Sequence, residues 1–125
     1  EIPLTLRDVA SSLVVATGHD MRGDTLPDWA GLALSGATVA VYMGRSVATK
    51  VAGKLIENGL PPSTPVAVIE NASRADRRAF AGRLDELAQI ADRPELDGPV
   101  VIIVGRVVAE SALGVSPLPL VAMAA

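Results

Sequence analysis

Four short aliphatic runs constrain the fold of this chain more than any other feature. They are SLVVAT at 12–17, TVAVYM at 38–43, PVAVIE at 65–70 and PVVIIV at 99–104. Each is rich in Val or Ile and is bounded by Gly, Pro, Asp or Asn, which is the pattern of a β-strand. Because nearly every position is apolar, both faces of these strands are expected to be covered, as in the sheet of an α/β protein.

Helical periodicity fills the intervals between these runs. Residues 45–58 carry apolar side chains at the spacing of one helical face, and Gly59 followed by two prolines ends that helix. The same spacing recurs over 84–91, which Pro94 closes, and a shorter helix is expected over 28–34. The pattern predicts an α/β fold: a single domain of about four to five strands in a mixed sheet with flanking helices.

Composition narrows the classes of function. The chain has no cysteine and one histidine, His19, which excludes disulfides and both thiolate and multi-His metal sites. The net charge is −3, and the one basic cluster, Arg74, Arg77 and Arg78, is expected to be a solvated turn. The longest aliphatic run is too short to cross a membrane. We therefore expect no metal, and neither nucleic acid nor membrane as a partner.

Two strand ends carry residues suited to a ligand, since ligands of α/β sheets bind where strands end. After the second run, Met43 offers a polarizable surface for an aromatic ring such as adenine, and Gly44 allows close approach. After the third run, Ala72 is small enough for a ligand to lie against the backbone. Core packing of Met43 and a structural turn at Asn71 are the alternatives. A third strand end, at 105–106, satisfies the same rule.

Taken together, these stretches resemble the C-terminal half of the uroporphyrinogen-III C-methyltransferases, a family of the tetrapyrrole methylase superfamily. The matching stretches are IPLTLRD, VVATGHD, DWAGLA, VAVYMGR, KLIENGLPPSTPVAVIENAS and VVIIVGRVVA, which cover about residues 2–109. The most specific part is YMG followed about thirty residues later by PVAVIENAS. Leu6 stands where the family commonly has a His, and ENAS replaces the usual ENGT, keeping a small residue and a hydroxyl.

The resemblance implies an activity and a cofactor. The family methylates uroporphyrinogen III with S-adenosylmethionine, giving precorrin-2 for sirohaem and cobalamin synthesis and S-adenosylhomocysteine as the second product. Its cofactor lies between two α/β domains, and the residues matching Met43 and Ala72 contact it. We therefore assign Met43 and Ala72 to cofactor binding. No catalytic residue is assigned, because the family's Gly-rich cofactor loop and its proton-handling carboxylate and lysine belong to the N-terminal half.

The resemblance also decides the expected organisation. Residues 1–109 would form the C-terminal domain of a tetrapyrrole methylase, with 110–125 as an irregular tail. A strand is expected over 78–84, although Ser73 and Asp76 match a capping box that favours a helix start. Because the chain opens without Met, we expect it to be part of a longer protein.

The expected partners are the tetrapyrrole substrate with the missing N-terminal domain, and a second copy in a cytoplasmic homodimer. Alone, the chain is expected to be inactive, because methyl transfer needs an aligned methyl donor and a proton acceptor. The alternatives are another precorrin methyltransferase, the same module within a multifunctional sirohaem synthase, and a non-enzymatic α/β module for binding or assembly.

Overall fold

A computed structural model describes residues 2–17, 29–42, 48–110 and 122–124 of the chain. The elements, in order, are β1 (Leu13–Thr17), α1 (Trp29–Leu34), β2 (Thr38–Tyr42), α2 (Ala48–Glu57), β3 (Pro65–Glu70), β4 (Arg78–Arg83), η3 (Leu84–Glu86), α3 (Leu87–Ala91), β5 (Val100–Val104), η4 (Arg106–Glu110) and β6 (Ala122–Ala124). The predicted α/β class with a mixed sheet is confirmed.

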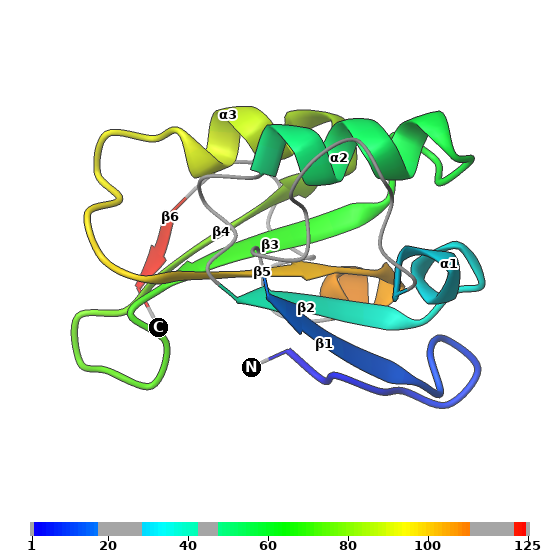
Figure 1. The fold of residues 1–125 in the computed structure, drawn as a ribbon. Coiled ribbons are helices and arrows are strands. Elements are labelled where there is room, and N and C mark those ends of the chain that lie inside the picture. The colour runs from blue at the N-terminus through cyan, green and yellow to red at the C-terminus, as the bar shows by residue number, and fades with distance from the viewer. Residues whose placement is uncertain (1, 18–28, 43–47, 111–121, 125) are drawn as a thin grey trace.

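The six strands form one sheet in the order β1-β2-β5-β3-β4-β6. The β1–β2 pair is parallel, and the other four pairs are antiparallel. Because β5 lies between β2 and β3 and opposes both, β2 and β3 run in the same direction (Figure 1). The carboxyl ends of β1, β2 and β3 therefore meet at one edge of the sheet, where β5 begins.

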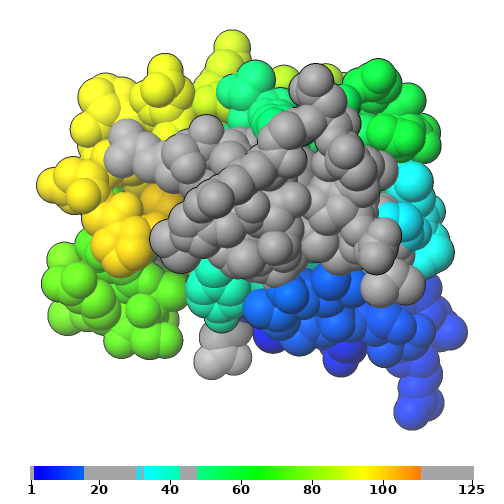
Figure 2. All heavy atoms as spheres, viewed as in Figure 1, coloured from blue at the N-terminus to red at the C-terminus, as the bar shows by residue number. Residues whose placement is uncertain are grey.

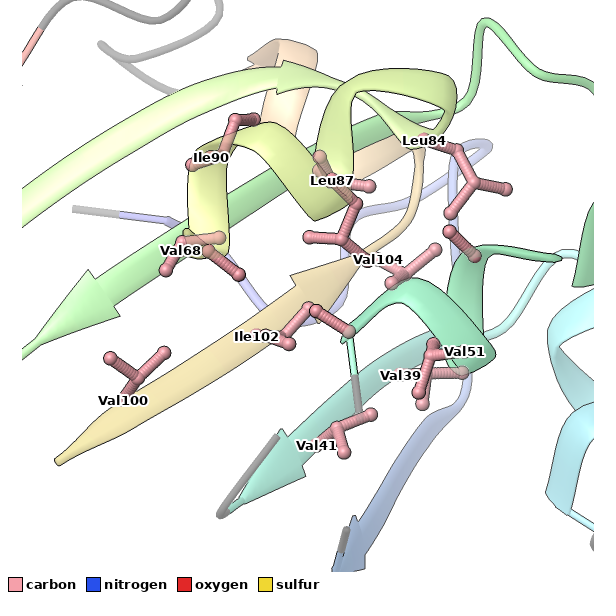
Figure 3. Packing of buried hydrophobic residues seen from close by; sticks show 14 of the residues in the cluster. Val39, Val41, Val51, Val68, Leu84, Leu87, Ile90, Val100, Ile102 and Val104 are labelled. Carbon is pink, nitrogen blue, oxygen red and sulfur yellow. The ribbon is translucent and has the colours of Figure 1, made fainter. Parts of the chain in front are cut away.

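The main core lies on one face of this sheet, beneath α2 and α3 (Figure 1). Alternate residues of the strands point toward these helices, among them Val68 of β3 and its register partner Ile102 of β5. Figure 3 shows Leu87 of α3 and Val51 of α2 packed over the strands, and all four side chains are fully buried. Each such side chain stabilises the fold by about 1.5–3 kcal/mol.

The other face carries a smaller cluster with a higher proportion of alanine. Its buried members are Ala67, Ala79, Ala81, Ile103 and Val108. Val108 belongs to η4, and the partly buried Ile2 packs against the same cluster. The short η4 and the N-terminal segment thus do on this face what two helices do on the other.

The ambiguous stretch after the arginine cluster is a strand, as expected. β4 pairs with β3 along its whole length, and Phe80 opposite Val68 enters the main core. The capping-box pattern lies in the turn before it, where Asn71 and Ser73 adopt left-handed backbone conformations. β6 falls within the segment expected to be an irregular tail and pairs with β4.

Candidate functional site

A cavity of about 1210 Å³ opens at the edge where β2 and β3 end and β5 begins. Its described walls come from five places: Tyr42 at the end of β2; Ala48 and Thr49 at the start of α2; Ile69, Asn71, Ala72 and Arg74 around the end of β3; Ala88, Gln89, Ala91 and Asp92 of α3 and its C-terminal end; and Gly98, Pro99, Val100 and Val101 leading into β5. Segments far apart in sequence thus converge on one space.

Of the two residues predicted to bind the cofactor, the structure describes one. Ala72 is exposed and lines the cavity directly after β3. Met43 lies outside the described residues, but its neighbour Tyr42 lines the same cavity with 53% of its surface exposed. The two strand ends singled out by the sequence therefore meet at one site, and the roles of Met43 and Ala72 remain predictions.

The third predicted strand end does not belong to this site. Gly105 and Arg106 follow β5, which runs antiparallel to β2 and β3, so they lie at the opposite edge of the sheet. There they line a separate space of about 280 Å³ with residues such as Leu60 and Pro65. The rule about strand ends failed at this point because it needs the direction of each strand, which a local pattern does not give.

Glu70, the last residue of β3, is a buried carboxylate next to the cavity. Only 1% of it is exposed, and its Oε2 accepts hydrogen bonds from the backbone N–H groups of Asp97 at 2.6 Å and Gly98 at 2.7 Å. Its Oε1 lies 3.8 Å from Nε of Arg78. Burial alone would raise the pKa of Glu70, but the N–H donors of Gly98 and Asp97 and the charge of Arg78 outweigh it and lower the pKa below its ordinary value.

Asn71 shapes the turn that follows. Its backbone has φ +53°, a conformation that Asn tolerates better than most residues. Its N–H donates to Pro99 O and its carbonyl accepts from Arg74 N, both at 3.0 Å, while Nδ2 donates to Asp76 Oδ2 at 3.2 Å. Oδ1 is buried and has no hydrogen-bond partner among the described residues. The structural turn proposed for Asn71 is therefore present, at the wall of the cavity.

The arginine cluster is a surface feature, as expected. Arg74, Arg77 and Arg78 are all exposed, and Arg74 is paired with Asp76 at 3.4 Å. Arg78 also donates to the carbonyl of Glu95 at 2.9 Å, which ties the β3–β4 turn to the connection after α3. Figure 2 shows this contact region from outside, with the turn in green beside the connection in yellow and orange.

The walls are suited to binding more than to acid–base chemistry. Alanine and valine side chains supply apolar surface, and Thr49, Gln89 and Asp92 add a few polar groups, which is the usual make-up of a small-molecule site.

Across the described ranges, no group of three or more His, Cys, Asp or Glu residues lies close enough to hold a metal ion. No helix in the described part of the chain is long and apolar enough to span a membrane. His19 lies outside that part.

The sequence did not point to the wall formed by α3 and residues 97–99. The one hint was the pair Gly98-Pro99 directly before a buried strand, which marks a turn but gives no partner. That wall faces the β3 end because of hydrogen bonds between residues 27 and 28 positions apart. Such contacts follow from the sheet order and not from local spacing.

The sequence and the fold of this chain resemble those of known proteins. Residues 1–88 match the family described as Tetrapyrrole (Corrin/Porphyrin) Methylases. The chain is 45% identical over 108 residues to siroheme synthase 2 of Cronobacter sakazakii, covering 86% of this chain and 23% of that protein. It is 39% identical over 118 residues to siroheme synthase of Gluconacetobacter diazotrophicus, covering 94% and 25%.

Among solved structures, the chain resembles uroporphyrin-III C-methyl transferase from Thermus thermophilus complexed with S-adenyl homocysteine. The TM-score is 0.71 at 29% sequence identity, covering 88% of this chain and 48% of that one. The native form of the same protein gives the same values. The chain thus spans about a quarter of the two siroheme synthases and about half of the solved methyltransferase.

Proposed function

Because the chain belongs to the tetrapyrrole (corrin/porphyrin) methylases, we propose that it supplies one wall of the cofactor cleft of an S-adenosylmethionine-dependent uroporphyrinogen-III C-methyltransferase. The observation that carries the proposal is the cavity where β2 and β3 end. It occurs in a fold that matches a uroporphyrin-III C-methyl transferase solved with S-adenyl homocysteine. Precorrin-2 would be the methylated product.

The residues present fit such a cofactor. S-adenosylmethionine, when bound, supplies an electrophilic methyl group on its sulfonium. The cavity combines apolar walls with a small exposed side chain at Ala72, which leaves room for an adenine ring against the backbone. Met43, next to the wall residue Tyr42, would add a polarizable thioether to the same ring. This chain's share of the chemistry is to bind and orient the cofactor.

We assign the rest of the reaction to the N-terminal half that the family resemblance implies. Methyl transfer requires the tetrapyrrole carbon in line with the sulfonium methyl and a base for the released proton. No described residue lining the cavity forms a buried pair of acid and base, so we place the proton transfers and the substrate contacts at the interface with the other half. A cytoplasmic homodimer completes the proposal, as the family resemblance implies.

A hybrid protein tests this function. Residues 2–109 would replace the matching segment of siroheme synthase 2 of Cronobacter sakazakii, the 45% identical relative. We expect this hybrid enzyme to methylate uroporphyrinogen III with S-adenosylmethionine, whereas the 125-residue chain alone shows no activity. Met43→Ala in the hybrid enzyme should weaken S-adenosylhomocysteine binding with little loss of fold.

Three outcomes separate the proposal from its rivals. A folded hybrid enzyme that binds no S-adenosylhomocysteine would contradict the cofactor role and favour a binding or assembly module. A hybrid that binds the cofactor but methylates only another precorrin would correct the substrate. If Met43→Ala costs about 2–5 kcal/mol of unfolding free energy, the value for removing a buried side chain, Met43 is a core residue.

A further inference from the structure

Glu70 occupies a position where the core pattern of β3 predicts an aliphatic side chain. Val66 and Val68 lie on the helix-covered face of the same strand at the two preceding alternate positions, and both are fully buried. Glu70 continues that column and is buried as deeply. A carboxylate at such a position is costly unless it is hydrogen-bonded, so its partners show what it does.

The partners of Glu70 are two consecutive backbone N–H groups in the connection from α3 to β5. One oxygen, Oε2, accepts from both Asp97 and Gly98, at 2.6 and 2.7 Å. Directly after them, Pro99 O accepts from the N–H of Asn71, so the connection is held to the end of β3 at three successive residues. Hydrogen bonds to an ionised carboxylate are about twice as strong as neutral ones, and Glu70 therefore fixes this connection firmly.

The same connection is a wall of the cavity. Gly98 and Pro99 line it on one side, and Asn71 and Ala72 line it beside them. Gly98 packs so closely on Asn71 that a methyl group there would overlap Oδ1 and lie 3.0 Å from Cγ of that side chain. The wall is thus set from two directions, by the carboxylate that holds its backbone and by the amide that it packs against.

We propose that Glu70 is a positioning residue for the cofactor cavity: its buried carboxylate holds the N–H groups of Asp97 and Gly98 and so keeps residues 97–99 in register with Asn71 and Ala72. The proposal rests on the proposed function in that the cavity is taken to bind the cofactor. Glu70 itself does not line the cavity among the described residues, so its effect on a ligand is indirect.

Glu70→Gln is the informative change, because it keeps the shape of the side chain and removes its charge. Glu95→Gln is the matched control: Glu95 lies in the same connection, is exposed, and pairs with Arg93 instead. Gly98→Ala crowds the Asn71 side chain on the same wall while leaving the Glu70 side chain itself unchanged. Each change is made both in the 125-residue chain and in the hybrid enzyme.

In the chain alone, amide hydrogen exchange measures how firmly the backbone of residues 97–99 is held. We expect exchange of the Asp97 and Gly98 amides in Glu70→Gln to accelerate about tenfold more than exchange of the Val68 and Ile102 amides, which follows global stability. In the hybrid enzyme, we expect the KM for S-adenosylmethionine to rise about tenfold in Glu70→Gln and in Gly98→Ala while kcat changes much less. Glu95→Gln should match the wild type in both measurements.

The outcomes keep the two proposals apart. If the wild-type hybrid enzyme binds no cofactor, the proposed function fails, and exchange in the chain alone still decides whether Glu70 holds the wall. Unchanged exchange at Asp97 and Gly98 in Glu70→Gln overturns the inference. So does a loss confined to global stability, with equal acceleration at Val68 and an unchanged KM, because Glu70 would then be structural only.

Discussion

Val68 and Glu70 lie two residues apart on the same face of β3, yet they belong to different kinds of structure. Val68 is surrounded by apolar side chains from α3, β4 and β5, among them Phe80 of β4, and none of them offers a polar group. Glu70 meets specific partners: two N–H groups and one guanidinium. Within two residues, the side chains on this face of β3 change from apolar packing at Val68 to specific polar contacts at Glu70.

This difference separates the part of the chain that stabilises the fold from the part that shapes the cavity. The core beneath α2 and α3 is apolar and buried, and burial of this kind supplies most of the favourable free energy of folding. The cavity end carries features that cost free energy, including the left-handed backbone of Asn71 and Ser73. Another is Oδ1 of Asn71, which is buried and finds no partner in the described part of the chain. The stability supplied by the core offsets these costs at the cavity end.

The largest effect on stability is expected from a substitution in the core beneath α3. Leu87→Ala removes a fully buried side chain of α3 and should lower the free energy of unfolding by about 2–5 kcal/mol. Leu4→Ala is the matched control, because Leu4 is 40% exposed and should cost much less. Urea unfolding followed by circular dichroism measures both. Equal losses would mean that packing under α3 is not the main source of stability.

Much of this fold followed from the sequence because β2, β3 and β5 are largely buried on both faces. The expectation that both faces are covered was wrong for β1, which exposes Leu13 and Val15. The runs at 12–17, 38–43, 65–70 and 99–104 correspond to β1, β2, β3 and β5 within one residue at each end. Burial from both sides makes a strand apolar throughout, and that pattern is local. β4 was harder to predict, because its sequence RAFAGR is not an aliphatic run. Its conformation depends on pairing with β3 along its whole length.

The site was harder to predict, and the reason is also physical. Ala72, which lines the cavity, could be singled out because a small residue after a buried strand is itself a local feature, and its contact with the cofactor stays a prediction. Glu70 has no such local signal, because its partners Asp97 and Gly98 are brought to it only by the antiparallel pairing of β3 with β5. The same pairing moved Gly105 away from the cavity. Strand direction is a property of the whole sheet, and no spacing within one run encodes it.

A substitution of Glu70 is expected to have an intermediate effect on stability, and this effect depends on pH. The pKa of Glu70 is lowered in the folded chain, so its carboxylate stabilises the fold above the ordinary Glu pKa of about 4.3, and that stabilisation is lost as pH falls through the folded pKa. At pH 7, Glu70→Gln should lower the free energy of unfolding by about 1–3 kcal/mol. At pH values below the folded pKa the difference from wild type should shrink.

Urea titrations across this pH range measure the effect, with Glu95→Gln as the control. The pKa of Glu95 is lowered too, chiefly by its hydrogen bond to Arg93, but that pair is exposed and its effect should disappear in high salt. The Glu70 effect should persist in high salt because the group is buried. A pH-independent difference for Glu70→Gln would show that shape, and not charge, holds the end of β3.

The smallest effect on stability is expected at the cavity surface, and there it separates folding from binding. Ala72 is exposed, so Ala72→Leu should change the free energy of unfolding by no more than about 0.5 kcal/mol. The larger side chain would nevertheless occupy the cavity, and in the hybrid enzyme S-adenosylhomocysteine binding should weaken at least about tenfold. Ala75→Leu is the matched control, in the same exposed turn but outside the cavity lining. Calorimetric titration measures binding, and thermal unfolding measures stability. If both variants bind like the wild type, the ligand does not lie against Ala72, and the end of β3 is shaped for a reason other than this cofactor.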